Sequence, residues 1–223
     1  MKYLTTLIFI FIFHFVGLSQ GQFYQKGYSG IGFGAGVNFP ENAMDYLGSV
    51  SYTFGGRATI LGLIGTTRST ENDLSSFNIG ANVIFYPYKY SQSKPITMEL
   101  AIGYMHSNYS DEVLSEFDLK LTGGALKLEG GFYYHIFINE MNQLIPWIKY
   151  EYNYTKARLS DGYGNYADDD ITLGFLKFGI DFSFSTSDKL DILVGPKITI
   201  GVKGEGNDNV TFGIQAQFVT HQF

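Results

Sequence analysis

Apolar and polar residues alternate with a period of two through most of the chain after residue 28. Within residues 171–184, for example, Phe178 and Ile180 alternate with Lys177 and Asp181. Such alternation indicates β-strands, because successive side chains of a strand point to opposite faces. No convincing helical period occurs after the N-terminal segment, so the pattern predicts an all-β chain. The pattern appears in ten segments, each close to the length that a tilted strand needs to cross a bilayer: 28–38, 47–54, 57–66, 76–86, 95–107, 123–137, 145–155, 170–184, 190–202 and 210–219.

The connections between these segments fall into two alternating sets. One set is short and includes Gly55-Gly56, 138–143 and 185–189; the other includes the long acidic stretches 107–124 and 155–170. Short turns on one side and long loops on the other are typical of outer-membrane barrels. With both termini in the periplasm the strand number is even. We therefore expect a single antiparallel transmembrane β-barrel of ten strands, with eight or twelve as alternatives.

The composition indicates which face of the strands is outside. Charged residues make up 16% of the chain, against roughly 25% in soluble domains, whereas aromatic residues reach 17%. We expect Phe, Ile, Leu and Val to face lipid, and Gly, Asn and the charged residues to face the lumen. Aromatic residues near strand ends are expected to form girdles at the membrane interfaces: Tyr52, Phe54, Phe85, Tyr104, Trp147, Tyr152, Tyr154, Phe182 and Phe184.

The N-terminus has the features of a secretory signal peptide. Lys2 is followed by an apolar run that begins at Leu7 and reaches Leu18, and small residues near Gly17 and Ser19 suit a cleavage site. We expect a cleaved signal peptide at 1–21 and a barrel at 22–223, located in the cell outer membrane; a retained helical anchor is the alternative. The chain has no Cys, which excludes a lipoprotein anchor, disulfides and thiol chemistry.

Two further classes are disfavoured. The net charge of −6 argues against a nucleic-acid partner, which would need a basic face. After residue 21 no run of 18 apolar residues occurs, so no membrane-spanning helix is expected in the mature chain.

Charged residues at inward-facing positions are the best candidate site. Their mixed signs are expected to pair in a narrow interior and fill it, since a ten-stranded barrel is only slightly wider than one that side chains fill; a polar conduit for a small solute is the alternative. A simple hairpin register places Lys177 opposite Lys197, so we expect a carboxylate, Glu151 foremost, beside them. The predicted lumen charge cluster is Glu99, Lys127, Glu129, Lys149, Glu151, Lys177, Asp181, Asp191 and Lys197.

Other candidate chemistry is weaker. The carboxylate-rich stretch 160–170 offers hard oxygen ligands for Ca²⁺ or Mg²⁺, but it matches no EF-hand loop and is expected to be a solvated extracellular loop. His106 lies beside Ser107, Ser110 and Asp111, a set that could form a nucleophile and base at the rim. The spacing matches no hydrolase motif, so we expect no enzyme, no catalytic or metal site and no cofactor. His135 is expected to face the lumen as a hydrogen-bonded filler.

Alternate glycines at the start of the barrel raise the question of a phosphate-binding loop. Gly30, Gly32, Gly34 and Gly36 recur at every second position, which does not give the G-x-G-x-x-G spacing of a dinucleotide site. They instead predict a first strand with a bare inner face, beside which large side chains such as Tyr133 or Lys149 have room.

The C-terminal segment carries a resemblance to known proteins. Residues Phe212 to Phe218 alternate cleanly and the chain ends on Phe223, which resembles the assembly signal of bacterial outer-membrane barrels. Phe218 and Phe223 have opposite parity, so either a bulge at Phe218-Val219 or a trailing coil is expected. The Tyr-, Phe- and Gly-rich texture resembles the PorT-like barrels of Bacteroidetes-type envelopes, and it covers no specific motif.

These features favour one function and leave two others open. We expect a structural or accessory barrel, embedded in outer-membrane lipid, that binds a protein or a surface polysaccharide through its extracellular loops. A small channel or transporter is the alternative, and a rim hydrolase is less favoured.

Overall fold

A computed structural model describes residues 29–71, 73–91, 93–187, 190–204 and 210–220. The expected signal peptide at 1–21 lies outside the described residues, as do the last three residues of the chain.

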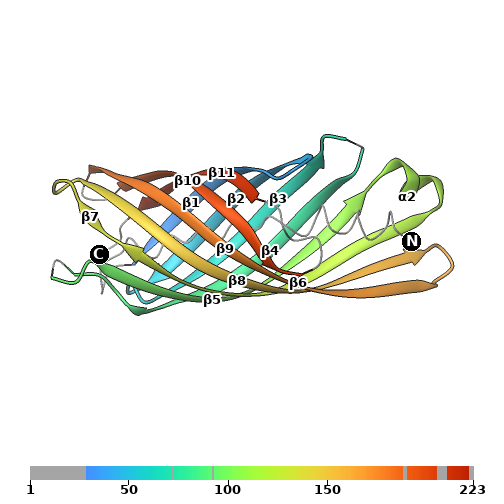
Figure 1. Ribbon diagram of the computed structural model, residues 1–223, viewed down its shortest axis with the longest axis horizontal. Coiled ribbons are helices and arrows are strands. Elements are labelled where there is room, and N and C mark those ends of the chain that lie inside the picture. Colours follow the sequence, from blue (N-terminus) through green and yellow to red (C-terminus); the bar gives the residue numbers. More distant parts are fainter. Residues whose placement is uncertain (1–28, 72, 92, 188–189, 205–209, 221–223) are drawn as a thin grey trace.

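The described chain forms a closed antiparallel β-barrel of ten long strands, as predicted (Figure 1). Each long strand pairs with the next long strand along the chain, so that β6 pairs with β8, and β1 pairs with β11. The two-residue strand β7 continues the line of β6 and pairs with the start of β8. The strands are β1 (Gly30–Phe39), β2 (Ala43–Phe54), β3 (Ala58–Ser69), β4 (Ser75–Tyr88), β5 (Ile96–Ser110), β6 (Leu119–Tyr134), β7 (Ile136–Phe137), β8 (Asn142–Asp161), β9 (Tyr166–Ser187), β10 (Leu190–Lys203) and β11 (Val210–Thr220).

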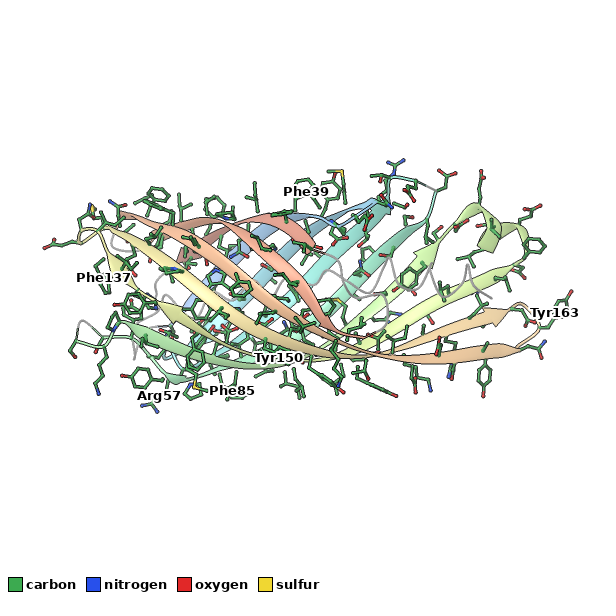
Figure 2. The ribbon with its side chains drawn as sticks, in the orientation of Figure 1. Phe39, Arg57, Phe85, Phe137, Tyr150 and Tyr163 are labelled. Atoms are coloured by element: carbon green, nitrogen blue, oxygen red, sulfur yellow. The ribbon has the colours of Figure 1, made fainter. Side chains whose placement is uncertain are left out.

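The side chains follow the predicted alternation. Large apolar residues such as Phe33, Ile64 and Ile102 are about half exposed on the outer face, although they lie in the middle of paired strands. Figure 2 shows side chains projecting all round the outside of the strands, Phe39 and Phe85 among them. We call this outer apolar surface the lipid-facing belt. A surface this apolar around a closed barrel is the arrangement of a membrane-spanning barrel, whose strands carry apolar residues outside and polar residues inside.

The aromatic girdle is only partly as expected. Phe54, Phe85 and Phe184 are exposed near the end of the barrel where β1 begins and β11 ends, which we call the terminal end. Trp147 was expected in this girdle, and that expectation was wrong. It is only 8% exposed and packs in the interior against Tyr133 and Ile145, because it shares the inward parity of Lys149.

The opposite end of the barrel is uneven in height. Residues 155–170 were expected to form a long loop, but β8 and β9 run through them with a tight turn between, so these strands extend, together with the end of β6, well past β10 (Figure 1). The stretch 107–124 was likewise expected to be a loop, yet β5 and β6 occupy most of it. Between them lies the short helix α2 (Glu112–Glu116), which the sequence pattern did not predict. Among the described residues no helix is long and apolar enough to cross a membrane.

The C-terminal strand is regular. Its pairing with β1 and β10 continues without a shift through Phe218 and Val219, so the bulge considered from the sequence is absent.

A charge placed on the lipid-facing belt should destabilise the barrel strongly. Ile102 lies mid-strand and is 47% exposed, so we expect Ile102→Arg to lower the free energy of unfolding in lipid vesicles by about 2–4 kcal/mol. Urea titration followed by the fluorescence of the single Trp measures this. Tyr163→Arg is the control, because Tyr163 is 95% exposed at the tip of the β8–β9 hairpin; a comparable loss there would contradict the assignment of the belt.

Candidate functional site

The nine residues of the predicted lumen charge cluster all lie at inward-facing positions of the barrel wall, and each is no more than 9% exposed. They come from five of the strands: Glu99 from β5, Lys127 and Glu129 from β6, Lys149 and Glu151 from β8, Lys177 and Asp181 from β9, and Asp191 and Lys197 from β10.

Three lysines and three glutamates of this set form one ion-pair network, which we call the lumen network. Glu129 lies at its centre, 3.2 Å from the amines of both Lys127 and Lys149 and 3.5 Å from that of Lys177. Glu151 accepts from Lys177 at 2.6 Å and also pairs with Lys127. The three positive and three negative charges balance, and each lies beside at least one charge of opposite sign.

On β5, the lumen network ends at Glu99. The amine of Lys149 donates to Glu99 at 2.7 Å, and the hydroxyl of Tyr133 donates to the second oxygen of the same carboxylate, also at 2.7 Å. Both side chains therefore turn toward β5, rather than filling the space beside the glycines of β1 as considered from the sequence.

The strand register explains how the network is layered. Glu129 lies directly opposite Glu151, and Lys149 lies directly opposite Lys177, so like charges face one another across two of the strand pairs. The contact between Lys149 and Glu99 runs along one row, whereas the other attractive contacts run between successive rows. Like charges directly opposite one another are destabilising, and the diagonal partners offset that repulsion.

The expected register between β9 and β10 was wrong. Lys177 lies opposite Thr199, and Lys197 lies opposite Gly179, so the two lysines are offset by two residues along the strands. The expected partner was right, since Glu151 contacts Lys177. The lysine directly opposite Lys177 is Lys149 on the other neighbouring strand.

Gly131 makes room for the contact that reaches across β6, from Lys149 on β8 to Glu99 on β5. It lies between Glu99 and Lys149 in the row that crosses β5, β6 and β8. A Cβ at this position would lie 2.5 Å from Cγ of Lys149 and 2.7 Å from the carbonyl oxygen of Ile148. The lysine can thus lie flat across β6 only because residue 131 has no side chain.

The other buried charges lie apart along the wall. Asp181 accepts a hydrogen bond from the side-chain amide of Gln215 at 2.8 Å. On β11, Gly213 lies opposite Lys197, and a Cβ there would meet Cε of that lysine at 2.5 Å, so a second glycine accommodates a second buried lysine.

At the terminal end, His135 is a hydrogen-bonded filler, as expected. Its ring nitrogens lie 3.0 Å from the Thr97 hydroxyl and 3.2 Å from the Gln143 amide oxygen, and the ring stacks on Tyr90. Next to Tyr90 is a pocket of about 570 Å³ that Arg57 and Lys89 line together with tyrosines. Burial lowers the pKa of Lys89 to about 7, and nearby Glu99 only partly offsets this.

At the opposite rim, the structure does not bring the side chains of His106, Ser107 and Asp111 together as a catalytic set. His106 lies on the outward face of β5 and Ser107 on its buried inner face, so the two side chains point to opposite sides of the wall. Asp111 caps helix α2 by accepting from the amide of Val113. His221 lies outside the described residues.

Carboxylates of the acidic stretch 160–170 bind other groups of the same hairpin. Asp168 pairs with Arg158, Asp170 accepts from the Tyr154 hydroxyl, and Asp161 caps the turn between β8 and β9. Within the part of the chain that the structure describes, no group of three or more His, Asp or Glu side chains is placed to hold a metal ion.

Comparisons with known proteins support the fold and no specific family. No family model matches the chain, and no curated protein matches it. Among solved structures, the chain is similar to the translocator domain of the autotransporter NalP from Neisseria meningitidis, with a TM-score of 0.51, 9% identity and 90% of each chain covered. It also matches a major outer membrane protein from Thermus thermophilus, with a TM-score of 0.45, 10% identity, and 86% of this chain and 98% of that chain covered.

The chain is an outer-membrane-type β-barrel by its closed ten-stranded sheet and its lipid-facing belt. At such low identity the similarity concerns the fold alone.

Removing one charge from the centre of the lumen network should unbalance it. We expect Glu129→Gln to lower the free energy of unfolding by about 3–5 kcal/mol, because it leaves buried lysines without their shared partner. Adding Lys177→Met to that variant should restore part of the loss, since it restores the charge balance. Urea titration in vesicles measures both variants.

The control for this experiment is Asp168→Asn, which breaks a solvent-exposed ion pair of the kind that contributes little to stability. If Glu129→Gln unfolds at the same urea concentration as Asp168→Asn, the lumen network is not a stabilising unit.

The glycine beneath Lys149 gives a second test. Gly131→Ala should destabilise the barrel by about 1–3 kcal/mol through overpacking, because the new methyl group meets both Lys149 and a backbone oxygen. Gly62→Ala on β3 is the matched control, since its nearest neighbour would be a Val50 methyl at an ordinary 3.6 Å. Equal unfolding midpoints for the two variants would rule out the proposed role of Gly131.

Proposed function

We propose that this protein is an integral outer-membrane barrel that presents a rigid interaction surface outside the cell, with the lumen network as structural filling. The observation that carries the proposal is the projection formed by β8 and β9. A strand of about 9–11 residues is enough to cross a bilayer, whereas β8 has 20 residues and β9 has 22.

The projection is an ordered sheet rather than a set of loose loops. β6 pairs with β8 out to Leu119 and Asp161, and β8 pairs with β9 out to Ser160 and Tyr166. By contrast, β9 pairs with β10 only as far as Gly174. The sheet therefore extends past the rest of the rim on one side of the barrel.

The tip of the β8–β9 hairpin and the neighbouring β5–β6 connection expose large side chains to water. Tyr163 is 95% exposed, Tyr166 and Phe117 are each 65% exposed, and Val113 on α2 is 57% exposed. Figure 2 shows Tyr163 at the far end of the molecule, opposite Phe137. Exposed aromatic side chains on a rigid scaffold are typical of interaction surfaces, and a protein or a surface polysaccharide would suit them.

The lumen supports a structural role over conduction. The six charges of the lumen network bond to one another across β5, β6, β8 and β9, so they are not offered to a solute. The orientation follows from the same proposal: the terminal end, with its short turns, faces the periplasm. The Tyr-, Phe- and Gly-rich texture of the chain resembles that of the PorT-like barrels of Bacteroidetes-type envelopes, and this resemblance assigns no role to individual residues.

Site-specific photo-crosslinking in the native outer membrane tests this function. A photoreactive phenylalanine at position 163 or 117 should give one discrete crosslinked product, because these side chains lie at the tip. The same residue at position 104, which lies on the lipid-facing belt, is the control and should give lipid adducts only. A product that appears equally from position 104, or no product from the tip, would contradict a tip-mediated role.

Conduction is tested separately in planar bilayers. Discrete, reproducible channels from the purified protein would support the alternative reading as a small channel. Such channels would also overturn the structural role of the lumen network.

A further inference from the structure

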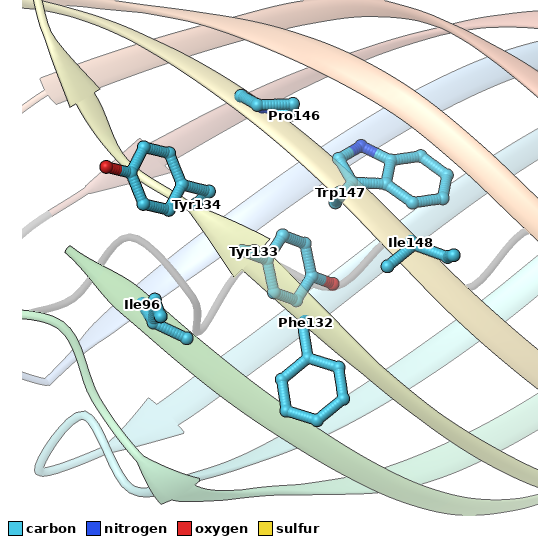
Figure 3. Close-up of a pocket in the computed structure, with 7 residues that line it drawn as sticks. All are labelled: Ile96, Phe132, Tyr133, Tyr134, Pro146, Trp147 and Ile148. Carbon is cyan, nitrogen blue, oxygen red and sulfur yellow. The ribbon is translucent and has the colours of Figure 1, made fainter.

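We propose that the barrel wall holds a specific binding site for one acyl chain of a phospholipid, between β6 and β8 near the terminal end. The site is a pocket of about 380 Å³, lined by Ile96, Phe132, Tyr133, Tyr134, Pro146, Trp147 and Ile148 (Figure 3). The inference rests on the membrane location of the barrel and is independent of what the extracellular tip binds.

The pocket lies where the strand pairing is interrupted. The ladder between β6 and β8 runs to Tyr133 and Trp147, and pairing resumes only at Ile136 and Leu144. The next position on β8 is Pro146, which has no N–H to donate and so cannot continue the ladder. The strand pairing of the barrel wall is therefore interrupted at Tyr134 and Pro146.

The local chain path keeps this interruption open. The amide of His135 donates to the carbonyl of Pro95 at 2.7 Å, which holds the end of β6 against the start of β5. On its other side, β8 stays paired with β9 through Pro146 and Ile180. β6 thus stays bound to β5, and β8 stays bound to β9. The crevice lies between these two strand pairs.

The mouth of the crevice belongs to the lipid-facing belt. Ile96, Phe132, Tyr134 and Ile148 are each between 42% and 52% exposed on the outer surface. A cavity that opens among such residues is continuous with the surface that lipid chains cover, and its lining is almost wholly apolar. Its volume is at the lower end of the roughly 300–1,000 Å³ of small-molecule sites, which suits a segment of one chain rather than a whole lipid.

The floor of the crevice separates lipid from the buried charges. Tyr133 and Trp147 are only 1% and 8% exposed, and their rings lie 6.4 Å apart between centroids. The amine of Lys149 lies 5.0 Å from the centroid of the Tyr133 ring and 5.5 Å from that of Trp147. An acyl chain in the crevice would cover these rings and exclude water from the wall next to the lumen network.

The single Trp of the chain makes the site directly measurable. The full-length mature protein is reconstituted in phosphatidylcholine vesicles with or without bromine atoms in the middle of the acyl chains, and bromine quenches tryptophan on contact. We expect strong quenching of Trp147 in the wild-type protein, although its side chain faces inward. Ile148→Phe and, separately, Ile96→Phe fill the crevice and should lose most of that quenching.

Ile102→Phe is the matched control, because it makes the same change on the belt outside the crevice, and it should keep the wild-type quenching. Native mass spectrometry after detergent exchange should show one retained phospholipid per wild-type chain and none on the filled variants. Heat-dependent mobility on gels confirms that each variant is folded.

Three results would overturn the proposal: no quenching of Trp147 in wild type, equal quenching in the crevice-filling variants and in Ile102→Phe, or a dimer without bound lipid in the mass spectrum. The last result would assign the crevice to a second copy of the chain. None of these results bears on crosslinking at the tip, so the two proposals fail independently.

Discussion

The structure depends on the pairing of every membrane-embedded backbone group with a neighbouring strand. Hydrocarbon offers no hydrogen-bond partner, so an open sheet edge inside a bilayer would cost several kcal/mol for each unpaired group. The pairing of β6 with β8 removes the last edge and turns a row of strands into a ring. Closure in turn fixes which side chains face inward, because the period of a strand is two.

Closure also concentrates charge. Strands β5, β6, β8 and β9 meet on one side of the ring, and their inward positions carry three lysines and three glutamates. Register alone would place like charges side by side there. The arrangement is stable because long side chains reach diagonally to the next row, and because Gly131 leaves a path for Lys149. The fold thus couples a backbone feature, the position of a glycine, to the electrostatics of the interior.

The sequence predicted the parts of the fold that lie within the membrane, where apolar and polar faces differ. The strand through Phe178 and Ile180 was identified for this reason, and parity placed Lys149, Glu151 and Lys177 on one face. It failed for residues 155–170, because the outward positions there carry Lys156 and Arg158 in place of large apolar residues, and the pattern of a lipid-facing strand is lost. The offset between Lys177 and Lys197 depends on the β9–β10 turn, and parity gives the face but not the register. Trp147 was misplaced because a general preference of Trp for interfaces was set above its own parity.

The long β9 strand has one further consequence. From Tyr166 to Leu173 it pairs with β8 on one side only, as far as the described residues extend. A free strand edge in water invites a second strand, and natural proteins protect such edges with charge. Asp168, Asp169 and Asp170 lie consecutively along this edge, so two identical copies laid edge to edge would bring their carboxylates together and repel. The edge that extends beyond β10 is therefore protected against pairing with a second copy of the chain.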